Sequence, residues 1–89
     1  MQDRYLEITF RKGKPLAGYL YLAREVGARS SRSEATGKGL VVDFGPEGRP
    51  IGIEITAPSR VTLTDLNELL QKYGLSPVST EELASLQAA

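Results

Sequence analysis

The chain has 89 residues, 40% of them hydrophobic, and its 11 Lys/Arg balance its 11 Asp/Glu to a formal net charge of zero. A chain of this length can build one thin core, so we expect a single small domain of modest stability. Neither cysteine nor histidine occurs, which excludes disulfides, thiolate nucleophiles, histidine-dependent catalytic triads and metal sites built from these two residue types.

Two strands are predicted at the start of the chain. Residues 5–11 alternate apolar and polar side chains, which is the pattern of a half-buried strand. The turn sequence KGKP follows at residues 12–15 and leads to a second strand over residues 16–23. The first strand turns Leu6, Ile8 and Phe10 toward one face of the sheet, and the other face receives Tyr5, Tyr19 and Tyr21.

Residues 24–37 are predicted to form a long mobile loop. The segment REVGARSSRSEATG contains two glycines, four Ser/Thr and almost no large apolar side chain. Little burial is therefore available to offset the entropy of ordering it.

A β-hairpin is predicted over residues 39–57, where two alternating segments flank the sequence GPEGRP. Pairing Phe44 with Ile51 places all the large apolar side chains on one face. The GxxG within GPEGRP suggests phosphate binding, but it joins two strands and does not open a helix, so we interpret it as a turn.

A helix follows, starting at Thr62 or Thr64, with Asp65 in its first turn. Gly74 and Pro77 indicate its end. A second, short helix is predicted from the capping-box sequence STEE at residues 79–82. The first helix carries an apolar stripe that must dock on the sheet, formed by Leu63, Leu66, Leu69, Leu70 and Tyr73.

These elements predict an α+β fold. We expect a small antiparallel β-meander of about four strands, with one helix packed on one face and a short C-terminal helix. Residues 1–75 would form the domain, and residues 76–89 a C-terminal tail that contains the short helix.

The charges are distributed unevenly along the chain. Residues 1–38 carry eight Lys/Arg against four Asp/Glu, whereas residues 39–89 carry three against seven. The N-terminal segment lacks the uninterrupted apolar run of a signal peptide, and no segment approaches the roughly 20 apolar residues of a membrane span. We therefore expect a soluble, cytoplasmic protein without a membrane partner.

One candidate polar site consists of Asp43 and Glu54, which share the non-core face of the predicted hairpin. Paired carboxylates can hold a proton between them or bind Mg²⁺ or Ca²⁺. Two carboxylates without a third ligand or a basic neighbour more commonly form the solvated face of a strand. We therefore predict no catalytic residue, no metal site and no cofactor.

The candidate interface consists of Tyr5, Tyr19, Tyr21 and Val41, on the face that no predicted helix covers. Such aromatic residues suit a homodimer or partner interface. Tyrosines interleaved with basic residues also occur on RNA-binding sheets. The zero net charge and the lack of a known RNA-binding signature weigh against that alternative.

Residues 33–60 resemble bacterial domain-of-unknown-function family 2283. The family is typified by a strand that ends in an acid, a glycine turn followed by arginine, and Gly-Ile-Glu-Ile with alanine and serine nearby. Residues 19–22 (YLYL) are similar to its earlier Asp-Ala-Leu-Tyr-Ile stretch. This chain departs from the family at Gly18, in place of an acid, at residues 12–15, in place of an aspartate-rich turn, and in its longer 24–37 loop. The matching positions are Asp43, Gly48, Arg49, Gly52, Ile53, Glu54, Ile55, Ala57 and Ser59.

The resemblance implies no particular activity, because the family has none established and no catalytic residue can be carried over. It implies a companion of small neighbouring proteins, some of which resemble toxin–antitoxin pairs.

We therefore predict a non-enzymatic protein–protein interaction module, with an antitoxin-like role as one form. The expected partners are a second copy of the chain or a small basic protein attracted by the acidic C-terminal half. The alternative is a nucleic-acid-binding module that uses the basic N-terminal half, and a third hypothesis is a cation or hydrolase site at Asp43 and Glu54.

Overall fold

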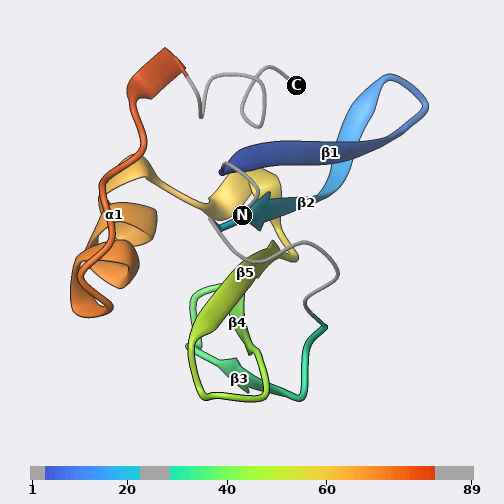
Figure 1. The fold of residues 1–89 in the computed structure, drawn as a ribbon. Helices are drawn as coiled ribbons and strands as arrows, with labels where there is room; N and C mark the ends of the chain where they lie inside the picture. Colours follow the sequence, from blue (N-terminus) through green and yellow to red (C-terminus); the bar gives the residue numbers. More distant parts are fainter. Residues whose placement is uncertain (1–3, 23–28, 82–89) are drawn as a thin grey trace.

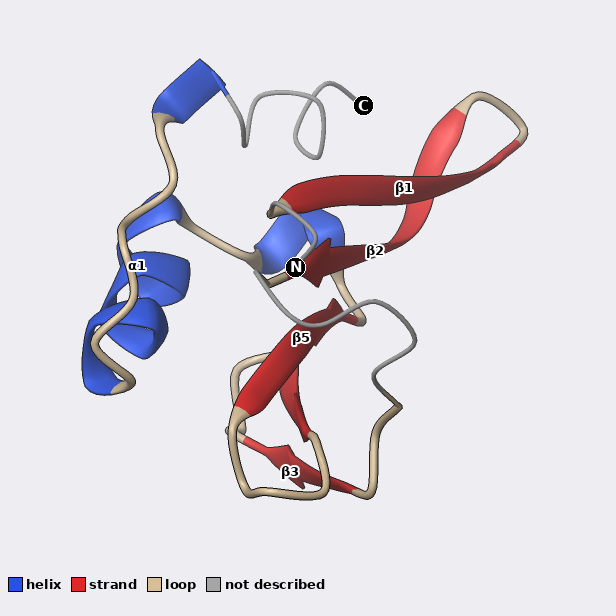
Figure 2. Cartoon of the chain, viewed as in Figure 1, coloured by secondary structure: helices blue, strands red, loops and turns tan. Residues whose placement is uncertain are grey.

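The computed structural model describes residues 4–22 and 29–81 (Figures 1 and 2). Within these residues, the elements of the fold are one antiparallel sheet and one complete α-helix, so the predicted α+β class is confirmed. The strand order across the sheet is β1-β2-β5-β4-β3. In chain order, the elements are β1 Tyr5–Arg11, β2 Lys14–Tyr21, β3 Arg32–Ala35, β4 Leu40–Phe44, β5 Pro50–Ile55, the 3-10 turn η1 Pro58–Arg60 and α1 Leu63–Lys72.

The predicted four-stranded meander is wrong in its connections. β2 pairs with β5, which places β5 in the sheet between β2 and β4. A meander would leave β5 at an edge, where one side of its backbone faces solvent. Four of the six β5 residues are buried: three isoleucines on the core face and Gly52 on the opposite face. In its central position, the backbone of β5 pairs with β2 on one side and with β4 on the other.

The fifth strand, β3, lies within the segment that we predict to be a mobile loop, so that prediction is wrong for Arg32–Ala35. β3 pairs with β4 along its whole length, with Ser33 opposite Asp43. All of its side chains are exposed, so its sequence lacks the alternation of apolar and polar residues that predicts a strand. The strand is held by its backbone ladder and by Arg32, whose guanidinium lies 4.0 Å from the centre of the Phe44 ring.

The hairpin of β4 and β5 has the predicted register as far as Asp43, which lies opposite Gly52. A bulge then shifts Phe44 to a position opposite Pro50. Within GPEGRP, the Gly45 N–H donates to the Arg49 carbonyl at 2.9 Å, and Gly48 adopts a φ of +79°. This segment is therefore a connection between strands, as its glycines predict.

The β1–β2 hairpin extends beyond the rest of the sheet (Figure 1). β2 pairs with β5 only from Gly18 to Tyr21, so the hairpin end, residues 9–17, has no β5 residue beside it. The turn has positive φ angles at Lys12 (+53°) and Gly13 (+78°), the combination of a type I′ turn. Phe10, expected on the core face with Leu6 and Ile8, is 54% exposed because the core does not reach this end.

The helix α1 begins and ends as its sequence predicts. The Thr62 hydroxyl accepts a hydrogen bond from the Asp65 N–H at 3.0 Å, which identifies Thr62 as the N-cap. At the other end, Gly74 adopts a φ of +70°, and the Leu75 N–H donates to the Leu70 carbonyl at 2.9 Å. The buried core joins the sheet to this helix through Leu20, Leu22, Leu40, Val42, Phe44, Ile53, Ile55, Val61, Leu66, Leu69, Leu70 and Val78.

Residues 76–78, which we place in the tail, pack on the domain. Val78 is 5% exposed, and its backbone makes two hydrogen bonds with the Asn67 side chain, at 2.8 and 3.2 Å. Arg4 donates to the carbonyls of Ser76 and Pro77. Residues 80 and 81 are helical, and the rest of the predicted short helix lies outside the described residues. Within the part of the chain that the structure describes, no helix is long and apolar enough to span a membrane.

Candidate functional site

The strand register brings all six sequence-predicted site residues to the face of the sheet opposite the core. One row across the sheet contains Tyr5, Tyr21, Gly52, Asp43 and Ser33, and the next row contains Glu7, Tyr19, Glu54, Val41 and Ala35. The tyrosines and the two carboxylates are therefore parts of one surface, which we call the polar face.

The three tyrosines of the polar face contact one another. The Tyr5 and Tyr21 rings stack, with centroids 4.4 Å apart, and the Tyr19 ring tilts against Tyr21 at 4.6 Å. Of the predicted interface residues, only Tyr5 is largely exposed, whereas Tyr19, Tyr21 and Val41 are half-buried. The contacts among the rings therefore cover much of the tyrosine surface that we predict to bind a partner.

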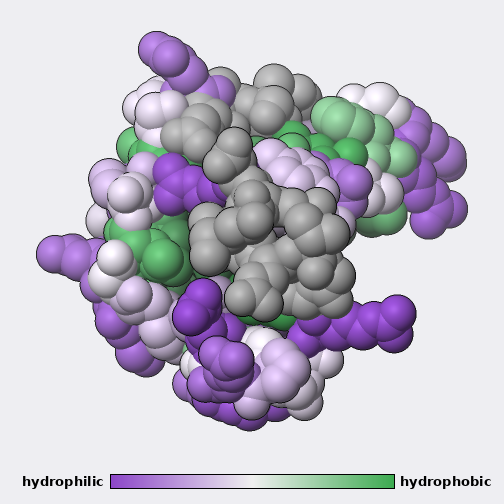
Figure 3. Space-filling model, in the orientation of Figure 1, coloured by the Kyte–Doolittle hydropathy of each residue, from purple (hydrophilic) through white to green (hydrophobic). Residues whose placement is uncertain are grey.

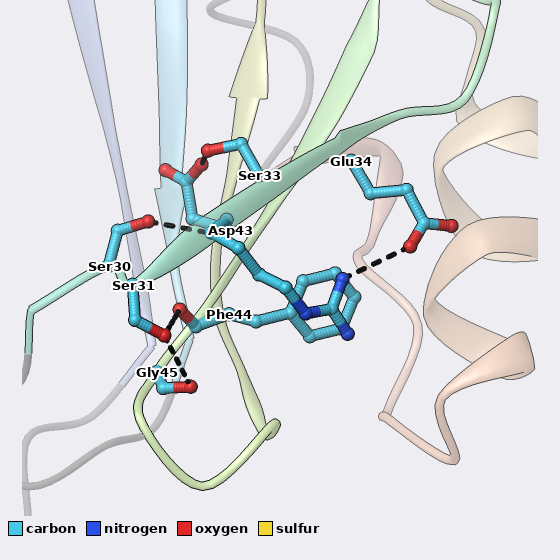
Figure 4. Close-up of polar contacts among 8 residues, drawn as sticks. Ser30, Ser31, Ser33, Glu34, Asp43, Phe44 and Gly45 are labelled. Atoms are coloured by element: carbon cyan, nitrogen blue, oxygen red, sulfur yellow. Dashed lines mark hydrogen bonds and ion pairs between the residues drawn. The ribbon is translucent and has the colours of Figure 1, made fainter.

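Asp43 is buried on this face and serves as a hydrogen-bond acceptor for two other strands. Its Oδ1 accepts from the Ser33 hydroxyl at 2.5 Å (Figure 4). Its Oδ2 accepts from the Tyr19 hydroxyl at 2.6 Å. Only 6% of Asp43 is exposed, so these donors replace the water that the carboxylate loses on folding. The network links β2, β3 and β4.

Gly52 makes the Tyr19–Asp43 contact possible. The tyrosine ring crosses β5 above Gly52 to reach β4, and a Cβ at position 52 would lie 2.0 Å from the Tyr19 hydroxyl oxygen. The absence of a side chain at this position is therefore a steric requirement of the network. From the sequence, Gly52 is named only as a position that matches family 2283, although a lone glycine in an apolar strand is a signal of close approach.

Glu54 lies beside this network. Partial burial, followed by a hydrogen bond and charge repulsion from Asp43, raises the pKa of the Glu54 carboxyl above its ordinary value. A protonated Glu54 can donate to Asp43, so the pair can hold one proton between two oxygens. The ion pairs among the described residues involve neither carboxylate.

Glu54→Gln is expected to stabilise the protein at pH 7. A raised pKa means that the folded state binds the proton more tightly than the unfolded state, so stability falls as the pH rises through the folded pKa. The glutamine side chain does not ionise, so the variant avoids the free-energy cost of deprotonating a partly buried carboxyl group. We expect a gain of at most about 1 kcal/mol, because solvent screens a half-buried charge.

Thermal unfolding from pH 3 to 8 measures this effect, with Glu47→Gln in the exposed β4–β5 turn as a control that removes the same charge. The Glu54→Gln advantage should disappear below the ordinary glutamate pKa of about 4.3. An advantage that stays constant with pH would contradict the assignment.

The exposed hairpin end is the feature that sequence reasoning missed. Phe10 and Leu16 are 54% and 52% exposed there, beside Arg11, Lys12 and Lys14. The sequence holds one signal for it, because Pro15 has no backbone N–H to donate, and proline in a sheet is confined to edge strands, strand starts and bulges. Alternation alone assigned Phe10 to the core.

The Asp43 carboxylate has a structural role on the polar face. Asp43 already accepts two intramolecular hydrogen bonds, and no group of three or more acidic side chains within residues 4–22 and 29–81 is placed to hold a metal ion. Comparison with protein-family models, with curated proteins and with solved structures finds no match to this chain. The resemblance to family 2283 therefore stays a prediction.

Proposed function

We propose that the protein is a non-enzymatic interaction module that self-associates through the end of its β1–β2 hairpin. The observation that carries this proposal is the position of the exposed apolar side chains. Across the described part of the chain, the large hydrophobic residues that remain exposed all belong to this hairpin: Phe10 and Leu16 lie at its end, and Tyr5 lies at the opposite end of β1. Exposed apolar side chains that cluster on one element are typical of an interaction site.

The surface around the hairpin end supports the same conclusion. Figure 3 shows hydrophobic residues next to strongly hydrophilic ones where the hairpin extends from the body. An apolar centre with a charged rim is the usual anatomy of a protein interface. The zero net charge of the chain also means that two copies do not repel one another as whole molecules.

The nucleic-acid alternative has less support from the basic residues. Arg4 donates to backbone carbonyls, Arg32 lies on Phe44 and pairs with Glu34, and Lys38 pairs with Asp65 and Glu68. These cations therefore act within the molecule. Nucleic-acid binding, a small basic partner and an antitoxin-like role all stay predictions.

Light scattering during size-exclusion chromatography tests the proposal over a range of protein concentrations. The unmodified chain should elute as a dimer, and the Phe10→Ser, Leu16→Ser double variant as a monomer with an unchanged circular dichroism spectrum. Both side chains are more than half exposed, so the fold should tolerate their loss. Tyr5→Ser is the matched control, because it removes an exposed side chain at the opposite end of β1. A monomer at every concentration, or a dimer that survives the double substitution, would contradict the proposal.

A further inference from the structure

The two edges of the sheet differ in their capacity to accept another strand. β3 forms one edge with only four residues, two of which are the charged Arg32 and Glu34. Short edge strands with charged side chains resist further pairing. β1 forms the other edge with seven residues, and among the described residues only β2 pairs with it. The backbone of β1 is therefore the better template for an added strand.

The free part of β1 lies at its hairpin end. At the opposite end, the Arg4 side chain reaches the carbonyls of Ser76 and Pro77, so the 76–77 segment lies next to the start of the strand. The last three residues, Thr9, Phe10 and Arg11, are exposed. A strand added along β1 has room from Glu7 to Arg11, a length typical of paired strands in proteins.

We propose that β1 pairs antiparallel with β1 of a second copy, in a register centred on Thr9. This inference rests on the proposed self-association and specifies its geometry. In this register, Glu7 of each copy lies opposite Arg11 of the other. Ile8 lies opposite Phe10 of the second copy on the core side of the sheet.

The chemistry of β1 is complementary to itself in this register. Directly opposite pairs interact most strongly, and each dimer contains two Glu7–Arg11 pairs and two Ile8–Phe10 pairs. Arg11 makes no ion pair with another described residue. Glu7 accepts one exposed hydrogen bond from the Tyr21 hydroxyl at 3.2 Å.

A register centred on Ile8 is less favourable. It would place Glu7 opposite Thr9 and would leave Arg11 opposite Tyr5. It would also extend the second copy along the start of β1, where the 76–77 segment lies. Both the charges and the available length therefore select Thr9 as the centre.

Single-cysteine variants test the register. Because the chain contains no cysteine of its own, any disulfide that forms must involve the introduced residue. Residues that face their own copies across a two-fold axis have Cβ atoms within about 5.5 Å, close to the distance that a disulfide needs. Thr9→Cys should therefore form a covalent dimer under mild oxidation. Glu7→Cys alone should not, but an equal mixture of Glu7→Cys and Arg11→Cys should form a mixed disulfide.

Charge reversal gives an independent test. Glu7→Arg and Arg11→Glu should each weaken homodimerisation at least about tenfold, because each places like charges opposite one another twice. A mixture of these two variants should form a heterodimer, and the Glu7→Arg, Arg11→Glu double variant should recover homodimerisation.

The outcomes separate this inference from the function on which it rests. If the unmodified chain is a monomer, both fail. If it is a dimer that the loss of Phe10 and Leu16 disrupts, but Thr9→Cys does not crosslink and the charge-reversed variants do not rescue each other, the register is wrong and self-association stands.

Discussion

Gly52→Ala is expected to lower the free energy of unfolding by about 2–3 kcal/mol. The added methyl group would lie 2.0 Å from the Tyr19 hydroxyl oxygen and 2.4 Å from the ring. The ring must move away, which breaks its hydrogen bond to the buried Asp43 carboxylate. A buried acceptor that loses a donor is costly, particularly when it is charged. Urea-induced unfolding, followed by circular dichroism, measures the change.

A double-mutant cycle with Tyr19→Ala is the control for this prediction. Once the ring is absent, Gly52→Ala should cost little, because alanine can adopt the backbone conformation of residue 52. An equal cost in both backgrounds would show that Gly52 is required for another reason than the Tyr19 ring.

Val78→Asp is expected to destabilise the protein by about 3–4 kcal/mol. The side chain is 5% exposed among apolar core residues, and an isolated carboxylate there must either remain buried without a partner or pull its segment away. Undocking would also break the two hydrogen bonds to Asn67. Because a domain of this size is only a few kcal/mol stable, the variant should be largely unfolded at 37 °C.

Ser76→Asp is the matched control, since Ser76 is exposed two residues earlier in the same segment. Its Tm should stay within about 3 °C of that of the unmodified protein. Equal Tm values for the two variants would show that the 76–78 segment contributes little to the fold.

The elements that the sequence predicts correctly have a signal within their own residues, either an alternation of apolar and polar side chains or a capping residue at a helix end. Alternation identifies β1, β2, β4 and β5, because each turns apolar side chains toward the core. Thr62 and Gly74 delimit α1 through interactions with backbone groups a few residues away. β3 has neither signal, since it is held by β4 and by contacts such as Arg32 with Phe44. Strand order is equally non-local, and an alternating pattern does not distinguish a β2–β4 pair from a β2–β5 pair.

The same distinction applies to the polar face. Alternation places Asp43 and Glu54 together, because they belong to neighbouring strands of one hairpin. The Tyr19 hydroxyl is 24 residues from Asp43 along the chain and reaches it only because β5 separates their strands and carries a glycine. The exposure of Phe10 depends on where β5 ends, which no property of β1 reveals.

The charged β3 edge bears on how many copies could assemble through the proposed contact. Pairing through β1 would use the longer edge of both copies, and the two edges of the joined sheet would then be β3 strands. Short edge strands with charged side chains resist further pairing, so we expect a closed pair and not an open-ended fibre. Arg32 and Glu34, which form an exposed ion pair on this edge, would thus limit polymerisation from the edge of the sheet opposite the contact between the two copies.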